Sequence, residues 1–406
     1  MKKAKTAAAV FFLATLGVCL ALVLTGVVRG GTGQQKPVAV SRYAPGAEGV
    51  TYRGLVDWFE DTCQGFCTTE LPGRMVLQEA NARINRAAGK WIFESTSPEV
   101  VRLKNGYLDS IGNFYYYLTQ VDQKVTAFDA WVAENLDCPY LYVQAPCKLC
   151  AIDDQLPFPE MTNNNQQADW LLERIAPAGV DCLDLRENLH QDGLDHYGCF
   201  YATDHHWTMD AGLWAARTLA EELNHRYGLD MDTAVLAEEN FDRRVWADAF
   251  LGSQGRRVTT VFAQPEDFIL PVPRWEPALR LRVPGPTPET SLDRTGGFEI
   301  LYNEEKIVPE DYYNGNSYGA VLQGDCPYLV VENRDNPAGP VIAVLRESFA
   351  IAPGPYLSLA AGELHLIDAR YYGGSVKDLL QEIQPDAVLS LLNVQCHTGA
   401  YFDQVR

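Results

Sequence analysis

The residues Asp204-His205-His206-Trp207 place a carboxylate, two imidazoles and an indole side by side in the chain. Asp204 and His206 lie two positions apart, so in an extended loop both side chains point to the same side. An aspartate that orients a histidine in this way supplies the general base of a nucleophilic hydrolase or acyl transferase. The motif contains no nucleophile, so the nucleophile must come from elsewhere in the chain.

Trp207 and His205 each have two interpretations. Trp207 is a candidate substrate-binding residue, because an indole face stacks on sugars, but a tryptophan that opens a helix is more often a core residue. His205 is expected to be structural, with its ring hydrogen-bonded to backbone. A carboxylate and two imidazoles also suit a metal ion, but no distant ligand set stands out to complete a site. We therefore expect neither a metal nor another cofactor.

A second group of metal-type residues precedes this motif. Cys147 and Cys150 form a CxxC pair, which is half of a zinc knuckle or a redox pair. No second pair completes a zinc site, so a local disulfide or simple packing is the favoured interpretation. His190 and His196 are expected to be surface or core residues.

Ser348 is the best candidate for the nucleophile. It follows Val341–Leu345, an apolar run rich in β-branched residues that predicts a buried parallel strand. Active sites of open α/β sheets form at the carboxyl ends of strands, and a turn there supplies backbone N–H groups for an oxyanion. We expect the Ser348 N–H to be one donor, with Asn393 or the amide of Gly106 as a second.

Strands and helices alternate along much of the chain. This order predicts an α/β fold with a parallel sheet covered by helices on both faces. The predicted helices are 71–88, 110–136, 166–175, 209–227, with Thr208 as N-cap, and 376–383. The predicted strands are 140–144, 180–185, 341–345, 364–367 and 387–392, and a strand–turn–strand unit covers 100–108.

The pattern is interrupted at about residues 240–310, where seven prolines break any helix. We expect an insertion of loops and antiparallel strands there. Leu279–Val283 alternates like an exposed strand, and the prolines on either side predict a sheet edge.

The N-terminus predicts a membrane anchor. Lys2, Lys3 and Lys5 precede the apolar run 7–28, which is long enough to span a bilayer. A signal-anchor over residues 1–29, a linker over 30–48 and an extracellular domain over 49–406 follow from this. A secreted protein with a cleaved signal is the alternative. The net charge of −20 argues against a nucleic-acid partner.

Asp204-His205-His206-Trp207 is the signature of the DHHW protein family, which is similar to the alginate O-acetyltransferases. Five further segments resemble landmarks of that family in the same order, so the resemblance spans about residues 50–400. These segments are Leu71-Pro72-Gly73-Arg74, Lys104-Asn105-Gly106-Tyr107-Leu108, Phe250-Leu251-Gly252-Ser253 and Glu347-Ser348-Phe349 with Ile367-Asp368-x-Arg370-Tyr371. Glu347 stands where the family has aspartate.

The resemblance implies an SGNH-hydrolase-like three-layer sandwich with a central parallel sheet plus a β/loop insertion. It implies Ser348 as nucleophile, His206 as base and Asp204 as the residue that orients it. The expected activity is O-acyl (acetyl) transfer to, or ester hydrolysis on, cell-surface polysaccharide, with a membrane O-acyltransferase as a partner. A non-catalytic glycan-binding or envelope scaffold protein that keeps the fold is the alternative, as is an envelope protein linked by disulfides or metal.

Overall fold

The computed structural model describes residues 74–93, 99–111, 120–158, 164–285, 287, 290–308, 312–313, 315–394 and 398–405. The chain divides into two compact units, Met1–Ala88 and Gly89–Arg406. The described part of the first unit is essentially helix α3 (Arg74–Ala87), as expected from the sequence. The predicted anchor and linker lie outside the described residues. No helix of the described ranges is long and apolar enough to cross a membrane.

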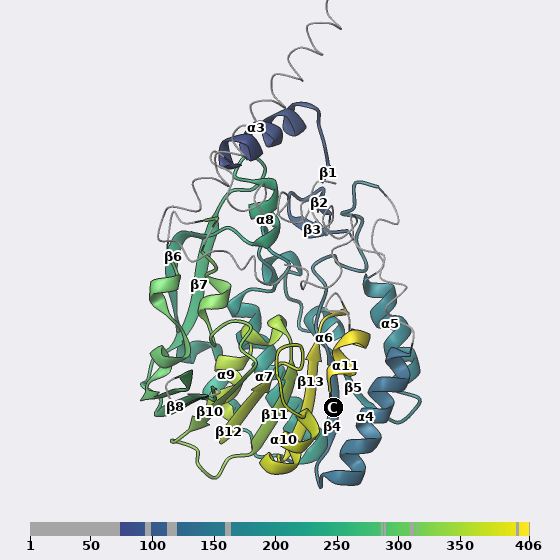
Figure 1. The fold of residues 1–406 in the computed structure, drawn as a ribbon, viewed down its shortest axis with the longest axis vertical. Coiled ribbons are helices and arrows are strands. Elements are labelled where there is room, and N and C mark those ends of the chain that lie inside the picture. The colour runs from purple at the N-terminus through teal and green to yellow at the C-terminus, as the bar shows by residue number, and fades with distance from the viewer. Residues whose placement is uncertain are drawn as a thin grey trace, which may run out of the picture. The chain divides into compact units, whose positions relative to one another are not determined.

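An eight-stranded mixed sheet organises the second unit, in the order β5-β4-β13-β11-β12-β10-β8-β9 (Figure 1). Neighbours from β5 to β12 are parallel, and the pairs from β12 to β9 are antiparallel. The parallel strands are β4 (Tyr140–Gln144), β5 (Asp181–Asp184), β11 (Val341–Arg346), β12 (Glu363–Ile367) and β13 (Ala387–Leu392). The antiparallel strands are β8 (Leu279–Val283), β9 (Leu292–Gly296) and β10 (Tyr328–Asn333).

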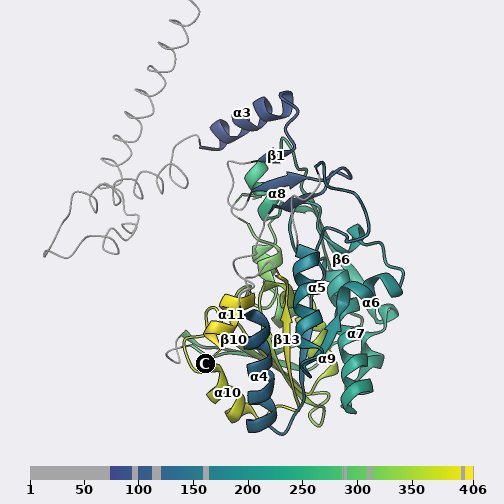
Figure 2. The ribbon, with the colours of Figure 1, turned by 90° about the vertical axis from the view of Figure 1, so that its right-hand side faces the viewer.

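Helices cover both faces of this sheet, and a hydrophobic core lies on each side (Figures 1 and 2). One core joins the sheet to α4 (Val121–Asn135), α5 (Asn164–Ile175), α10 (Val376–Ile383) and α11 (Thr398–Gln404). The other joins it to α6 (Leu185–Gln191), α7 (Met209–Tyr227) and α9 (Gly354–Ala360). The predicted three-layer α/β architecture is confirmed.

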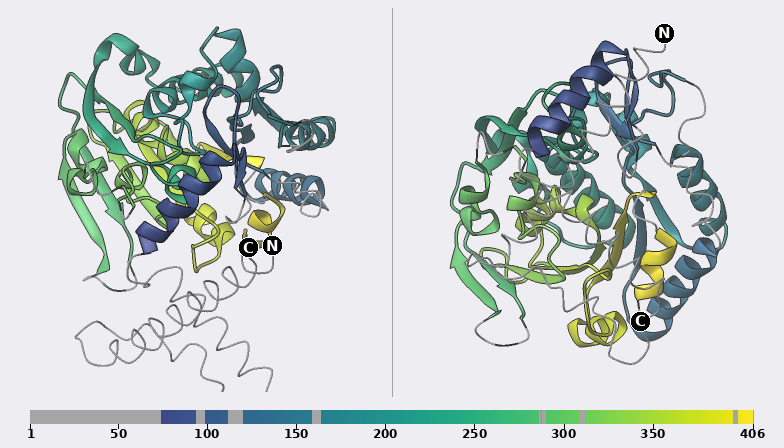
Figure 3. Two further views of the ribbon diagram at one scale, coloured as in Figure 1. Left: turned by 90° about the horizontal axis from the view of Figure 1, so that it is seen from above. Right: turned by 45° about the horizontal axis from the view of Figure 1, so that its top comes forward.

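The last strand of the described ranges, β13, lies between β4 and β11 in the middle of the sheet, as the labels of Figure 1 show, and its yellow ribbon is also seen in Figure 3. Its six residues are all buried, which matches their unbroken apolar sequence. The sheet therefore brings the residues after β4, β11 and β13 to one edge, although they are far apart in sequence.

The sequence prediction was wrong about Leu279–Val283 being a sheet edge. This strand is β8, and it pairs with β10 on one side and β9 on the other. Leu279 and Leu281 are fully buried in the core, so the alternation marks a covered face rather than an exposed ribbon. The insertion thus extends the central sheet instead of standing apart from it.

Two helix boundaries also differ from the expectation. Ser110 belongs to strand β3 (Leu108–Ser110), and α4 begins at Val121 after Gln120, which has a left-handed backbone with φ of 69°. Helix α5 begins at Asn164, before the predicted start at residue 166.

Two smaller sheets complete the second unit. One contains β1 (Ile92–Phe93), β2 (Val100–Arg102) and β3, with the predicted turn at Asn105-Gly106 between β2 and β3. The other pairs β6 (Phe241–Phe250) with β7 (Glu266–Pro273), and the short helix α8 (Ser253–Val258) connects them.

Candidate active site

The Asp204–Trp207 segment is a tight, backbone-bonded turn. The Tyr201 N–H donates to the His206 carbonyl at 3.2 Å, and Phe200 pairs with Trp207 as an antiparallel bridge. Helix α7 starts directly after the turn. The Thr208 side chain accepts from the Ala211 N–H at 3.2 Å, which is the predicted N-cap. The rigid helix therefore fixes where the turn ends.

Asp204 holds the His206 ring in one orientation. Its Oδ1 lies 2.5 Å from His206 Nδ1 and accepts from the His206 N–H at 3.0 Å. Its Oδ2 accepts from the Ser253 N–H at 2.5 Å. Burial by itself raises the pKa of Asp204, but His205 and His206, with these hydrogen bonds, lower it well below its usual range. The buried carboxylate is therefore an anion when the protein is folded.

The other nitrogen of His206 meets Ser348. His206 Nε2 lies 2.7 Å from Ser348 Oγ, although the two residues are 142 positions apart. Ser348 follows β11 and opens the short 3₁₀ helix Ser348–Ile351, so a strand end positions it as expected. The structure thus brings the three residues expected from the sequence into one hydrogen-bonded chain, Asp204–His206–Ser348.

The segment Gly252-Ser253 supports Asp204 from behind. A Cβ on residue 252 would lie 2.2 Å from the Asp204 Cβ and 2.6 Å from the Thr203 carbonyl oxygen, so only glycine fits there. The Gly252 N–H donates to Thr203 Oγ1 at 2.8 Å, and the next amide binds Asp204. This is a physical reason for the Phe-x-Gly-Ser pattern at 250–253.

Glu266 ties the same turn to β7. Its carboxylate accepts from the Ala202 N–H and the Thr203 N–H, both at 2.9 Å, and from the Thr203 hydroxyl at 2.5 Å. Sequence reasoning missed this residue because nothing in the pattern around Glu266 marks it as a partner of a turn more than sixty positions earlier.

Tyr318 is a second residue that the sequence did not indicate. Its ring stacks on the His206 ring, with centroids 4.1 Å apart and planes 15° apart. Its hydroxyl donates to the Ser348 carbonyl at 2.9 Å. Burial raises the pKa of Tyr318 well above its usual value, so the hydroxyl stays a donor. Tyr318, at the start of the 3₁₀ helix Tyr318–Ala320, therefore touches both His206 and Ser348.

Glu347 competes for the hydroxyl of Ser348. Its Oε2 lies 2.9 Å from Ser348 Oγ, and its Oε1 accepts from the Asn393 N–H at 3.3 Å. Burial raises the pKa of Glu347, although Arg370 and His206 oppose that shift. In the structure Ser348 Oγ donates to this carboxylate, so Glu347 and His206 are both partners of the same hydroxyl.

The Asp368-x-Arg370 landmark lies beside Glu347. Arg370 forms a paired contact with Asp368, at 2.9 Å and 2.6 Å, at the end of β12. It also reaches Asp325 at 3.3 Å. Arg370 therefore supplies the positive charge that acts on the pKa of Glu347.

The predicted substrate contact by Trp207 is wrong. Its side chain is fully buried, and its indole N–H donates to the Phe349 carbonyl at 2.8 Å. The ring face is therefore unavailable to a sugar, and the core alternative describes the residue. The indole instead ties the base's turn to the residue after the nucleophile.

His205 lies outside the relay. Its Nδ1 is 3.2 Å from Ser253 Oγ and 3.4 Å from Asp204 Oδ1, so it contacts side chains rather than backbone. Burial and the neighbouring His206 lower the pKa of His205 to about 3, so the ring is neutral in the folded protein.

The expected second oxyanion donors are both engaged. The Asn393 side-chain amide donates to the Pro146 carbonyl at 2.9 Å, and its backbone N–H donates to Glu347. The Gly106 N–H closes its own turn by donating to the Leu103 carbonyl at 2.9 Å. The Gly106 amide therefore stabilises its own turn and is not free to bind an oxyanion.

The cysteines of the described ranges are free. These are Cys138, Cys147, Cys150, Cys182, Cys199 and Cys326. A Cys147–Cys150 disulfide is therefore absent from the structure, and Cys147 is packed in a small core with Ala168 and Val394.

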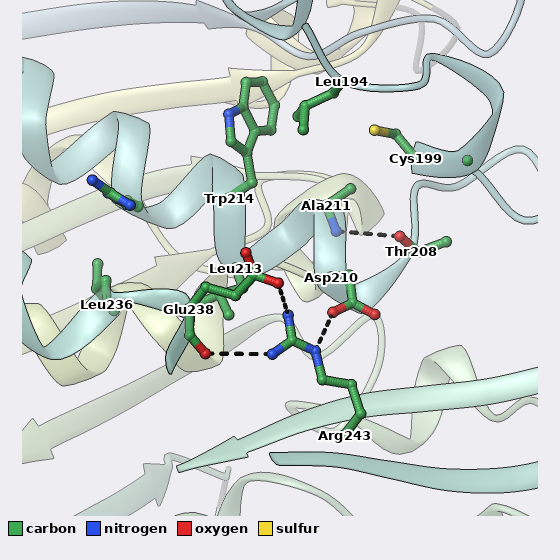
Figure 4. A pocket seen from close by; sticks show the side chains of 12 residues that line it. Leu194, Cys199, Thr208, Asp210, Ala211, Leu213, Trp214, Leu236, Glu238 and Arg243 are labelled. Atoms are coloured by element: carbon green, nitrogen blue, oxygen red, sulfur yellow. Dashed lines mark hydrogen bonds and ion pairs between the residues drawn. The ribbon is translucent and has the colours of Figure 1, made fainter. Parts of the chain in front are cut away.

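A separate cavity of about 390 Å³ opens on the α7 side of the domain (Figure 4). Trp214, Leu194 and Leu236 line it, and Arg243 bridges Asp210 and Glu238 at its floor. Neither Ser348 nor His206 lines this cavity, so it is not the space above the nucleophile.

Comparisons with known proteins bear on the fold and on the family that this chain resembles. Residues 137–245 match the model of the SGNH hydrolase-like domain of the acetyltransferase AlgX. The chain resembles SGNH-like acetyltransferases. The matched segment of this SGNH-like domain includes Asp204 and His206, and Ser348 lies outside it. No curated protein matches the chain significantly.

Solved structures show the same fold. Bacillus cereus PatB1 is 19% identical with a TM-score of 0.60, over 75% of this chain and 98% of that chain. A second PatB1 structure, with a sulfonyl adduct, is 18% identical with a TM-score of 0.60, over 75% of this chain and 96% of that chain. A DHHW family protein from Eubacterium siraeum is 13% identical with a TM-score of 0.59, over 76% of this chain and 95% of that chain. The predicted SGNH-hydrolase-like fold is confirmed.

Proposed function

We propose that this protein is an extracytoplasmic O-acyl (acetyl) transferase or esterase that acts on cell-surface polysaccharide. Ser348 is the nucleophile, His206 the general base and Asp204 the residue that orients the imidazole. The observation that carries the proposal is the pair of contacts at His206, 2.5 Å to Asp204 Oδ1 and 2.7 Å to Ser348 Oγ. The match to an acetyltransferase domain supports the choice of acyl chemistry.

In the first step, Ser348 Oγ attacks the carbonyl carbon of an acyl ester while its proton moves to His206 Nε2. The imidazolium lies against the Asp204 anion, which stabilises the new charge. The tetrahedral intermediate then expels the donor alcohol, which takes the proton from His206. The acyl group is left as an ester on Ser348.

In the second step, a sugar hydroxyl or water gives its proton to His206 and attacks the acyl-serine. Collapse of the second intermediate returns the proton to Ser348 Oγ and releases the acylated sugar or the free acid. The Ser348 N–H, at the start of the 3₁₀ helix, is suited to receive the developing oxyanion. A general base contributes about 10² to 10⁴-fold to such a rate.

The location is part of the proposal. The lysines before the apolar run at the N-terminus favour a signal-anchor that leaves the domain outside the membrane. A glycan is then the acceptor within reach, and a membrane O-acyltransferase would supply acyl groups, by analogy with the alginate O-acetyltransferases. A secreted form after signal cleavage performs the same chemistry.

One observation favours the alternative of a non-catalytic glycan-binding scaffold. Glu347 lies 2.9 Å from Ser348 Oγ, so an ionised Glu347 would accept the proton that His206 needs. The alternative holds if that carboxylate keeps Ser348 unreactive.

Covalent labelling separates the two functions. The full chain is treated with an aryl sulfonyl fluoride, and the modified peptide is located by mass spectrometry. We expect a sulfonyl group on Ser348, as PatB1 carries a sulfonyl adduct in one of its structures. Loss of labelling in Ser348→Ala and in His206→Ala supports an enzyme. Absence of any label on the folded wild type rejects the enzyme and favours the scaffold.

A further inference from the structure

A second cluster of ligating side chains lies apart from the Asp204–His206–Ser348 chain. It contains Cys150, in the loop after β4, His190, near the end of α6, and His196, at the start of the 3₁₀ helix Tyr197–Cys199. One ligand atom from each residue lies within 4.8 Å of the other two. Cys150 Sγ is 3.9 Å from His190 Nε2, and the two imidazole rings are stacked with centroids 5.5 Å apart.

His196 has the hydrogen-bond arrangement of a metal ligand. Its Nε2 lies 2.9 Å from the Lys148 carbonyl oxygen, which can only accept, so the proton is on Nε2. That tautomer leaves a lone pair on Nδ1. Within the described ranges, His196 Nδ1 is buried and has no hydrogen-bond partner. Histidines that bind metals commonly hold their other N–H against a backbone carbonyl in this way.

Cys150 is arranged to become a thiolate when a cation arrives. Its side chain is buried. The backbone N–H groups of Ala151, Ile152 and Asp153 donate toward the sulfur. A turn of amides around a sulfur stabilises a metal-bound thiolate.

We propose that Cys150 Sγ, His190 Nε2 and His196 Nδ1 bind Zn²⁺. Zinc is the cation of choice for a mixed thiolate and imidazole set, with bonds of about 2.3 Å to sulfur and about 2.0 Å to nitrogen. Tetrahedral geometry then needs ligand atoms about 3.3–3.8 Å apart, and the Cys150–His190 separation is already 3.9 Å. Binding releases the thiol proton to solvent. His190 is exposed, so water completes the coordination.

The polar atoms of Asp204 and His206 make that motif a poorer metal site. Both oxygens of Asp204 and both ring nitrogens of His206 already have partners, in Ser253, Ser348 and each other. A cation there would have to break this chain. His196 Nδ1 needs no such displacement.

A bound zinc ion would connect the loop after β4 to the segment that leads into the Asp204 turn. The Thr208 N–H donates to the Cys199 carbonyl at 2.8 Å, so the chain just after His196 is part of the turn's backbone frame. The site is therefore expected to stabilise the frame of the active site without supplying a group to the reaction.

Metal titration of the full chain tests the proposal. The protein is reduced, stripped with a chelator and titrated with Zn²⁺, and with Co²⁺ to report thiolate ligation by its charge-transfer absorption. We expect one Zn²⁺ per chain and a thiolate–cobalt band. Both should be lost in Cys150→Ser and weakened at least about tenfold in His190→Ala, where an exposed ligand is removed without disturbing the core.

Two variants serve as controls. Cys147→Ser changes a buried cysteine of the same loop that is outside the cluster, and it should bind Zn²⁺ like the wild type. Asp204→Asn should also bind it. The proposal is overturned if the reduced wild type binds no stoichiometric Zn²⁺, or if binding survives in Cys150→Ser and His190→Ala. It is equally overturned if Asp204→Asn alone abolishes binding.

Discussion

Two histidine clusters in this protein have similar dimensions but differ in the hydrogen bonds of their imidazole nitrogens. In both Asp204–His205–His206 and Cys150–His190–His196, the ligand atoms lie within 4.8 Å of one another. In the first cluster the working imidazole has a partner on each nitrogen. In the second, a buried imidazole nitrogen of the described structure has none. An imidazole that is hydrogen-bonded at both nitrogens, like His206, is suited to proton transfer. A buried nitrogen with a free lone pair, like His196 Nδ1, is suited to binding a cation.

Substitutions in the hydrogen-bonded chain Asp204–His206–Ser348 should have the largest effects on activity. We expect Ser348→Ala and Asp204→Asn each to lower the rate of acyl transfer by about 10³ to 10⁴-fold or more. Cys150→Ser should change that rate far less, because its cluster contributes no reacting atom. Initial rates with an acyl ester donor, measured for the three variants side by side, check this. Comparable losses in Cys150→Ser would break the distinction between the clusters.

A substitution at Gly252, which packs against Asp204, should have the next largest effect. In Gly252→Ala the new methyl would meet the Asp204 Cβ at 2.2 Å, so the turn must move. We expect a loss of about 1–3 kcal/mol in the free energy of unfolding, from urea denaturation. Acyl transfer should fall by about 10²-fold because the carboxylate is misplaced.

Gly373→Ala is the matched control, because a Cβ there has nothing within 4 Å. A Gly252→Ala variant as stable and as active as Gly373→Ala would show that the close approach of Gly252 to Asp204 does not matter.

Tyr318→Phe should have a smaller effect on the relay. The ring that stacks on His206 is kept, and only the hydrogen bond to the Ser348 carbonyl is lost. We expect the free energy of unfolding to fall by about 0.5–1.5 kcal/mol and kcat/KM to fall by about two- to tenfold. Tyr356→Phe, which removes a buried hydroxyl bonded to the Pro271 carbonyl, should lose similar stability at unchanged kcat/KM. Equal kcat/KM in both variants would remove Tyr318 from the site.

Glu347 gives the smallest effect and a dependence on pH. Its pKa is raised in the folded state, so its contribution to stability is full below about pH 4.5 and is lost as the pH rises through the raised value. Glu347→Gln removes the titration and keeps the size of the side chain. The free energy of unfolding of the variant minus that of the wild type should therefore grow as the pH rises from 4.5.

The control for this measurement is Glu173→Gln, at an exposed position of α5. Its difference from the wild type should be small at every pH. A Glu347→Gln difference that stays constant with pH would mean that Glu347 is not a buried titrating group.

Much of the scaffold could be predicted from local pattern. The helix Met209–Tyr227, the strand Tyr140–Gln144 and the helix Val376–Ile383 match the structure residue for residue. Periodicity and caps determine such elements within a few turns of chain. The resemblance to the DHHW family predicts that Asp204, His206 and Ser348 meet. The position of Ser348 at the carboxyl end of a buried strand, where active sites of α/β sheets form, supports the same prediction.

The rest depends on contacts between distant segments. The stacking of Tyr318 on His206 joins residues many positions apart and has no local sequence signal. Gly252 lies in a segment that the family resemblance marks, but nothing in that segment indicates its close approach to Asp204. The alternation at Leu279–Val283 predicted a strand correctly, but it could not reveal that β9 would pair with that strand's other edge. The sequence favours a local disulfide or packing for Cys147 and Cys150 because no second CxxC pair follows, and nothing in it joins Cys150 to His190 and His196.

We propose above all that Asp204, His206 and Ser348 catalyse acyl transfer through an acyl ester on Ser348. The most direct measurement is to mix the full chain with an acyl ester donor, quench with acid and map the acyl group by peptide mass spectrometry. We expect an acyl group on Ser348 in the wild type, much less in Asp204→Asn and none in Ser348→Ala. An acyl group on another residue, or none at all on a folded wild type that turns over the donor, would contradict it.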